Sequence, residues 1–135
     1  KLQARVVPLR IENVVRIVDA LYGVVNDGGT GVRARIPALE VCGKTGTAQL
    51  VSSRGARDRE LPEHLRDNAW FVGFAPRSQP EIVVAALFEN GGHGHLAAPI
   101  VRDVIKAYFD KKARQRSIDM LVTSRRPASG PSRKG

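Results

Sequence analysis

The stretch Lys44-Thr45-Gly46-Thr47-Ala48-Gln49 carries the residue types of this chain that are best suited to chemistry. It lies inside residues 41–50, which are predicted to form a β-strand interrupted by Gly43 and Gly46. Glycines weaken a strand, and they are expected where a ligand or another backbone comes very close to it. The stretch therefore predicts a ligand-contacting strand that presents one lysine and two threonines.

Other chemically suggestive residues favour structural roles. His93 and His95 have no third ligand nearby in the sequence, so a solvated glycine-rich loop is favoured over a metal pair. Cys42 is the only cysteine, which excludes an internal disulfide or a CxxC metal site and favours a small buried side chain. Acidic residues alternate with arginines between residues 57 and 67, as in a solvated loop. The sequence predicts no metal and no cofactor.

Two helices and two further strands are predicted to position this strand. Residues 11–25 have the three-and-four apolar spacing of a helix, which ends at Asn26-Asp27-Gly28-Gly29. The remaining expected elements are an extended piece at 33–37, a surface loop at 52–67, strands at 68–75 and 81–89 with a hairpin connection at 76–80, and a helix at 98–112.

This order predicts an α+β fold with an antiparallel sheet of three strands flanked by helices. Both faces of the strands at 68–75 and 81–89 are apolar, which is typical of a sheet that is covered on both sides. Two helices cannot cover both faces well. We therefore expect this chain to be part of a longer protein, an interpretation that a first residue other than Met also favours.

The net charge of +9 is concentrated near the C-terminus. Residues 1–110 hold 14 basic and 12 acidic residues, whereas residues 111–135 hold 8 basic residues and one acidic residue. A basic segment favours an anionic partner, but this one contains no aromatic residue for base stacking, so nucleic acid is not expected as a partner. Composition predicts a disordered tail at 113–135, with anionic phospholipid or an acidic wall polymer as its possible partners.

Three stretches together resemble the transpeptidase domain of class B penicillin-binding proteins, in particular the elongation-type penicillin-binding protein 2 group. They are VCGKTGTAQ (41–49), LPEHLRDNAWFVGFAP (61–76) and LFENGGHG (87–94). K-T-G is one of three signatures of such enzymes, the others being S-x-x-K and an S-x-N motif. The resemblance covers residues 11–112 and assigns residues 1–112 to the C-terminal portion of that domain. Cys42 departs from the small residue that is common at its position.

The resemblance implies a peptidoglycan D,D-transpeptidase that works through an acyl-serine intermediate. Lys44 would supply a positive charge near the nucleophile and the substrate carboxylate, and would help to move a proton. Thr45 and Thr47 would offer hydroxyls to that carboxylate, and the Thr47 N–H would form half of an oxyanion hole. Gly46 would let the substrate backbone lie against the strand. The implied catalytic residues are thus Lys44 and Thr47, and the implied substrate-binding residues are Thr45, Gly46 and Thr47.

The printed sequence contains neither S-x-x-K nor S-x-N, so the chain alone is expected not to form an acyl-enzyme. The implied partners are peptidoglycan stem peptides ending in D-Ala-D-Ala, β-lactams, an N-terminal remainder of the enzyme and a membrane glycan polymerase of the rod-shape complex. The implied location is the periplasmic side of the inner membrane. Two alternatives stay open: a serine β-lactamase or β-lactam sensor, and a non-catalytic basic binding module.

Overall fold

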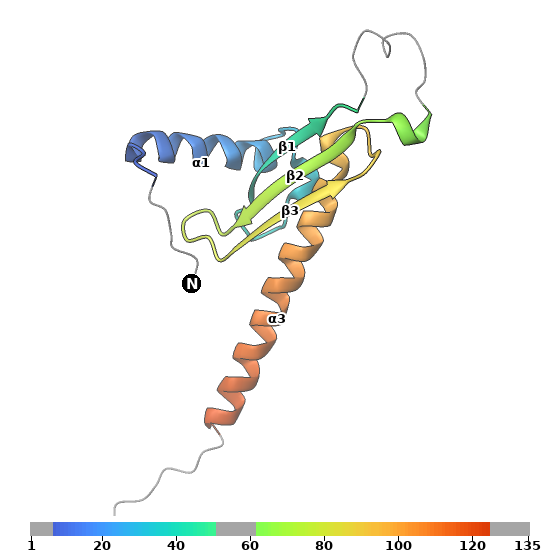
Figure 1. Ribbon diagram of the computed structural model, residues 1–135. Helices are drawn as coiled ribbons and strands as arrows, with labels where there is room; N and C mark the ends of the chain where they lie inside the picture. The colour runs from blue at the N-terminus through green and yellow to red at the C-terminus, as the bar shows by residue number, and fades with distance from the viewer. Residues whose placement is uncertain (1–6, 51–61, 125–135) are drawn as a thin grey trace, which may run out of the picture. The chain divides into compact units, whose positions relative to one another are not determined.

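The structure, a computed structural model, describes residues 7–50 and 62–124. Its main elements, in chain order, are α1 (Ile11–Asn26), β1 (Cys42–Ala48), β2 (Asn68–Ala75), β3 (Ile82–Phe88) and α3 (Ala98–Ser124), as Figure 1 shows. Short 3-10 helices lie between them at Val32–Ala34, Glu63–Leu65 and Gly94–Leu96. The chain divides into two compact units, one ending at Ile105 and one beginning at Lys106.

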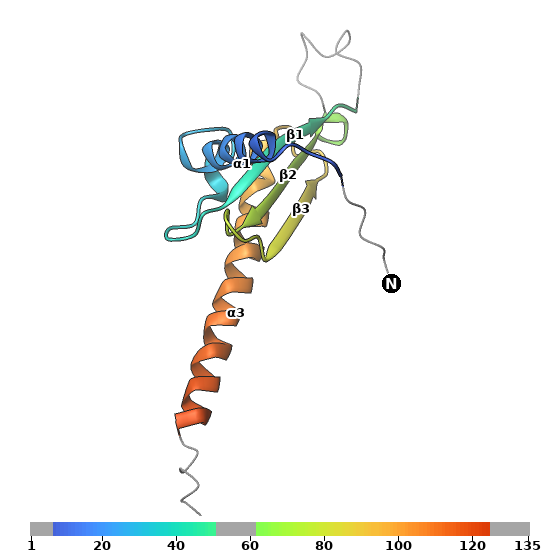
Figure 2. The same cartoon turned by 90° about the vertical axis from the view of Figure 1, so that its left-hand side faces the viewer.

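The three strands form one antiparallel sheet in the order β1-β2-β3. The views in Figures 1 and 2 both show β2 between its two partners. In the register, Thr45 of β1 lies opposite Phe71 of β2, and Phe71 lies opposite Ala86 of β3. The expected α+β fold and antiparallel sheet are confirmed, and within the described residues β1 is an edge strand.

The core is centred on Phe71, which is fully buried. A Cβ added at Gly43 would lie 2.5 Å from the Phe71 ring, one added at Gly31 would lie 2.9 Å from it, and one added at Gly73 would lie 3.1 Å from it. The ring therefore packs directly on three glycines, and a side chain at Gly43 or Gly31 would have to displace it. This contact fixes β1, β2 and the turn after α1 against one another.

The helix α1 packs against β1 and is tied to the sheet near its middle and at its C-terminal end. Near its middle, Asp19 forms an ion pair with Arg77 of the β2–β3 connection, and the Arg77 guanidinium lies 4.7 Å from the centre of the Tyr22 ring. At its C-terminal end, the Asn26 side-chain amide donates a hydrogen bond of 2.9 Å to the Val41 carbonyl oxygen. These contacts place the helix at the start of β1.

One face of the sheet is left uncovered by the described residues. Along β2 the buried side chains alternate with exposed ones, so that Trp70 is 39% exposed and Val72 is 42% exposed. On the same face of β3, Leu87 is 42% exposed and Val83 is 68% exposed. This confirms that the helices of this chain do not cover both faces of its sheet.

Two sequence predictions about local structure are wrong. The expected extended piece at 33–37 is a 3-10 helix at Val32–Ala34 followed by a single bridge between Ile36 and Leu39. The helix expected to end at residue 112 continues to Ser124, so the predicted disorder of the tail fails for residues 113–124, while residues 125–135 lie outside the described residues. Most of the predicted loop at 52–67 also lies outside them. The domain boundary at residue 112 stays a prediction.

Cys42 matches its predicted structural role. Its side chain is fully buried, and its Sγ lies 3.9 Å from the Val18 carbonyl oxygen of α1. Burial raises the pKa of the Cys42 thiol, because a low-dielectric surrounding disfavours the thiolate. The thiol therefore packs as a small apolar group rather than serving as a nucleophile.

Replacing Gly43 with alanine is expected to destabilise the fold by about 1–3 kcal/mol, the typical cost of overpacking a core. The added methyl group would collide with the Phe71 ring and, at 2.9 Å, with the Val72 carbonyl oxygen. Urea unfolding of the 135-residue chain, followed by Trp70 fluorescence, measures the loss. Gly46→Ala is the matched control on the same strand, because its methyl group would meet only the Trp70 Cβ at 3.4 Å. Equal stability of the two variants would contradict the packing of Phe71 on Gly43.

Candidate active site

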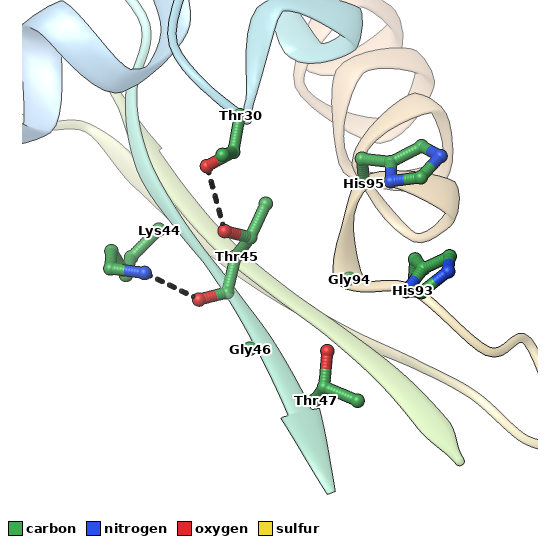
Figure 3. A pocket seen from close by; sticks show the side chains of 8 residues that line it. All are labelled: Thr30, Lys44, Thr45, Gly46, Thr47, His93, Gly94 and His95. Carbon is green, nitrogen blue, oxygen red and sulfur yellow. Dashed lines mark hydrogen bonds between the residues drawn. The ribbon is translucent and has the colours of Figure 1, made fainter. Parts of the chain in front are cut away.

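The four residues Lys44 to Thr47 occupy the middle of β1 and line one open depression of about 550 Å³, which Figure 3 shows from close by. The 3-10 helix at Gly94–Leu96 and the turn after α1 supply the other walls. The lining residues are Thr30, Lys44, Thr45, Gly46, Thr47, His93, Gly94 and His95. The structure thus brings together every residue that the sequence singled out for the site.

Strand alternation separates the lysine from the two hydroxyls. Thr45 lies opposite the buried Phe71, whereas Lys44 lies opposite the exposed Val72, so their side chains leave β1 on different faces. Figure 3 shows Lys44 on one side of the strand, and Thr45 and Thr47 on the other. A ligand that contacts all three must therefore lie along the edge of β1.

The Lys44 ammonium group is already held at this strand. Its Nζ donates a hydrogen bond of 2.8 Å to the carbonyl oxygen of Thr45, while the side chain stays exposed to solvent. This bond uses one of the three donors of the ammonium group. Two donors and the full charge therefore remain for an anionic ligand.

Thr30 is a site residue that the sequence analysis missed. Its Oγ1 lies 2.9 Å from the Thr45 Oγ1, so the two hydroxyls share a hydrogen bond across 15 positions of the sequence. The preceding stretch Asn26-Asp27-Gly28-Gly29 predicts the end of a helix, and nothing in it indicates a contact between Thr30 and Thr45. The bond orients Thr45, because a hydroxyl that has a fixed partner is no longer free to rotate.

The glycines of β1 predict that another backbone comes close to this strand, and the structure shows such a contact. The backbone that approaches Gly46 is that of Gly94. A Cβ added at Gly94 would collide with the carbonyl oxygen of Gly46 and would lie 2.9 Å from its nitrogen. Gly94 thus packs directly on the backbone of the Lys44–Thr47 stretch. This contact anchors the loop of His93 and His95 beside Thr47.

The two histidines lie at the rim of the depression with their rings stacked, at a centroid distance of 5.7 Å and an angle of 17°. Figure 3 shows the two rings across the depression from Lys44. Among residues 7–50 and 62–124, no group of three or more His, Cys, Asp or Glu side chains is placed to hold a metal ion.

Asp67 has a structural role beside the depression, whereas the sequence predicted it to be part of a solvated loop. Its Oδ1 accepts a hydrogen bond of 3.2 Å from the Leu50 N–H, just beyond the end of β1. Its carbonyl oxygen accepts one of 2.8 Å from the Gly92 N–H, in the loop that leads to His93. Asp67 therefore links the end of β1 to the loop on the other side of the depression. Asp58 and Glu60 lie outside the described residues.

Comparison with known proteins identifies the family. Residues 2–106 match the model of the penicillin-binding protein transpeptidase domain. The chain belongs to the penicillin-binding protein transpeptidase family. The resemblance found in the sequence is thereby confirmed as a partial domain of the penicillin-binding protein 2 type, since the relatives include proteins named MrdA and a solved penicillin-binding protein 2.

Two curated relatives illustrate the match of this transpeptidase chain. It is 43% identical over 96 residues to the peptidoglycan D,D-transpeptidase MrdA of Acinetobacter baumannii, covering 69% of this chain and 14% of that protein. It is 41% identical over 81 residues to the peptidoglycan D,D-transpeptidase PbpA of Mycobacterium tuberculosis, covering 56% of this chain and 15% of that protein. The chain therefore spans about one seventh of the length of these relatives.

Solved structures of the family share the fold. The penicillin-binding protein 2 of Pseudomonas aeruginosa, solved in complex with WCK 5153, superposes with a TM-score of 0.59 at 34% identity, covering 76% of this chain and 20% of that one. The imipenem acyl-enzyme complex of penicillin-binding protein A from M. tuberculosis superposes with a TM-score of 0.55 at 30% identity, covering 75% of this chain and 20% of that one. The transpeptidase fold is thus shown for the first unit.

The substitution Gly94→Ala is expected to move the histidine loop away from β1, because its methyl group has no room beside the Gly46 carbonyl oxygen. Amide chemical shifts of Gly46 and Thr47, recorded by ¹H–¹⁵N NMR on the 135-residue chain, measure the displacement. Leu96→Ala is the control, since it shortens a side chain of the same 3-10 helix without adding an atom beside Gly46. An unchanged Thr47 shift in Gly94→Ala would show that the two backbones are not in contact.

Proposed function

We propose that this chain supplies the lysine-and-threonine wall of a peptidoglycan D,D-transpeptidase active site. One observation carries the proposal: Lys44, Thr45 and Thr47 line a single open depression at the edge of an exposed strand of a transpeptidase-family fold. A strand edge with free backbone groups can take up an extended peptide as an additional strand. The side chains beside that edge then select a peptide that ends in a carboxylate.

The two sides of β1 have different roles in this proposal. Thr45 and Thr47 offer hydroxyl donors to the terminal carboxylate of a D-Ala-D-Ala stem peptide, with Thr30 orienting Thr45 at 2.9 Å. The charge of Lys44 favours the same carboxylate and assists proton transfer at the nucleophile. The Thr47 N–H provides half of the oxyanion hole, where it stabilises charge that develops only in the transition state.

The nucleophile is expected to come from the uncovered face of the sheet. Lys44 leaves β1 on the face where Trp70 and Val72 are exposed, and the printed sequence has no S-x-x-K motif. Burying this apolar face against further chain is favourable, and elements that cover it would reach the Lys44 ammonium group. An N-terminal remainder of the enzyme that packs there can thus place a serine beside Lys44.

The proposed reaction has two steps. The serine Oγ attacks the carbonyl carbon of the penultimate D-Ala, the C–N bond breaks, and the terminal D-Ala leaves with a proton on its nitrogen. The amine of a second stem peptide then attacks the ester carbon, and the serine leaves with its proton restored. A β-lactam takes the place of the donor peptide in the first step and remains attached to the serine.

The same proposal includes the setting of the enzyme. Its substrates are peptidoglycan stem peptides, its inhibitors are β-lactams, and it works with a membrane glycan polymerase of the rod-shape complex. We place it on the periplasmic side of the inner membrane. Support comes from relatives that are named peptidoglycan D,D-transpeptidases. None of the described helices is long and apolar enough to cross a membrane.

A chimera tests the proposed role of Lys44. The aligned segment of the A. baumannii MrdA relative is replaced by this chain, and the product is labelled with a fluorescent penicillin. The chimera is expected to be labelled, and Lys44→Ala to lower the acylation rate by about 10²–10⁴-fold, the usual contribution of a group that moves a proton. Slow loss of the label distinguishes a transpeptidase from a β-lactamase, which would hydrolyse it quickly.

Lys106→Ala is the matched control in the chimera, because it removes the same charge from an exposed ion pair with Asp110. Such surface pairs contribute little to stability, so labelling is expected to stay at the level of the unsubstituted chimera. The 135-residue chain by itself is expected to remain unlabelled. Labelling of the Lys44→Ala chimera at the control rate would refute the role of Lys44, and labelling of the isolated chain would refute the need for a nucleophile from another segment.

A further inference from the structure

The second unit of the chain carries a continuous stripe of basic and apolar side chains on one face of a helix. In the part of α3 from Lys106 onward, Lys111, Arg114, Ile118, Leu121 and Val122 follow one another at intervals of three, four, three and one residues. Positions three and four apart lie on the same side of an α-helix. We refer to these five residues as the C-terminal stripe.

The apolar half of the stripe is open to solvent. Ile118 is 53% exposed, Leu121 is 61% exposed and Val122 is 65% exposed. Three large aliphatic side chains that lie side by side on one helical face form a patch that water solvates poorly. Exposed apolar patches mark sites of interaction with a partner.

The basic half of the stripe carries charge that this unit does not neutralise. The two acidic residues of 106–124 already have partners, since Asp110 accepts from Lys106 at 2.6 Å and Asp119 accepts from Gln115 at 3.0 Å. Lys111 and Arg114 make no ion pair with the residues that the structure describes. The sequence beyond Ser124 adds four basic residues and no acidic one. The segment is therefore strongly cationic beside its apolar patch.

The stripe also lies outside the region that the transpeptidase family accounts for. The family model ends at residue 106, and the stripe begins at Lys111. The proposed lysine-and-threonine wall of the active site belongs to β1, in the first unit. The stripe thus needs an explanation that does not depend on the proposed transpeptidase reaction.

We propose that the C-terminal stripe binds the surface of an anionic phospholipid bilayer. Lys111 and Arg114 would contact the lipid phosphates, while Ile118, Leu121 and Val122 enter the boundary between headgroups and acyl chains. Binding of a helix at the membrane interface strengthens with the apolar area that it buries and with the attraction of its basic side chains to anionic lipids. The long stems of lysine and arginine let their charged ends stay in water while the helix lies at this depth.

The chemistry of the stripe favours lipid over the other anionic or apolar partners. Nucleic acid is disfavoured, because no aromatic residue follows Phe109 to stack on bases. A helical partner is disfavoured as well, because a coiled coil needs an apolar seam over three or more heptads, whereas the apolar part of the stripe spans only Ile118 to Val122. An anionic bilayer matches both halves of the stripe at once.

Vesicle co-sedimentation of the 135-residue chain tests the proposal. The chain is expected to bind vesicles of phosphatidylglycerol mixed with phosphatidylethanolamine, and to bind pure phosphatidylcholine vesicles at least tenfold more weakly. Binding is expected to weaken as salt rises from about 0.1 M to about 1 M, because the Debye length falls from about 10 Å to about 3 Å. Equal binding to both vesicle types would overturn the proposal.

Neighbouring positions on the helix provide matched controls. Leu121→Asn is expected to weaken binding about fivefold or more through lost apolar burial, whereas Met120→Asn, exposed but outside the stripe, should change it less than about twofold. Arg114→Gln is expected to weaken binding about fivefold, the effect of one basic side chain at an anionic surface, and Arg116→Gln less. Equal effects of Leu121→Asn and Met120→Asn, or of Arg114→Gln and Arg116→Gln, would show adsorption that does not depend on the stripe and would overturn the proposal.

The oligomeric state tests the remaining alternative. The mass of the chain in solution, measured by light scattering without lipid, is expected to be the same for the unsubstituted chain and for Leu121→Asn. A larger assembly that Leu121→Asn dissociates would assign the stripe to a second copy of the chain and overturn binding to lipid.

Discussion

The packing of the Phe71 ring on bare glycine backbone is the constraint on which the rest of the first unit depends. Gly43 belongs to β1, Gly73 to β2 and Gly31 to the turn after α1, so one buried ring sets the distance between three segments. Interiors at this density do not yield to an added methyl group without a shift of backbone. The site inherits this rigidity, because Thr30 directly precedes Gly31 and Thr45 lies opposite Phe71. The hydrogen bond between their hydroxyls is a consequence of that packing.

Strand geometry then limits how the site can work. A strand sends successive side chains to opposite faces, so Lys44 and Thr45 cannot both face a ligand that lies on one face of the sheet. Only the edge of β1 is accessible from both sides, and an extended peptide is the ligand shape that matches an edge. The Gly94 contact with Gly46 adds a second limit, because it closes one side of the depression beside Thr47. Both limits point to a ligand that runs parallel to β1.

Local signals of the sequence predicted the elements well, and contacts between distant segments were harder to predict. The strand Asn68–Ala75 was predicted to the residue, because apolar alternation and a proline mark its limits. The full length of α3 could not be predicted from apolar periodicity, because that periodicity is weak after Phe109. The helix persists there through good intrinsic formers and through pairs four residues apart, such as Gln115 with Asp119. Thr30 was missed since nothing in its own segment indicates that it lies next to Thr45 in the fold.

The net positive charge of this chain comes from its C-terminal segment, whereas the charge at the depression comes from Lys44. Residues 1–110 are close to neutral, with 14 basic and 12 acidic residues, although the whole chain has a net charge of +9. Every residue that lines the depression belongs to this nearly neutral part of the chain. The cation at the site is Lys44, held by the Thr45 carbonyl oxygen at 2.8 Å. In the proposed function, recognition of a carboxylate at the depression depends on this local charge and on the neighbouring hydroxyls, whatever the C-terminal segment binds.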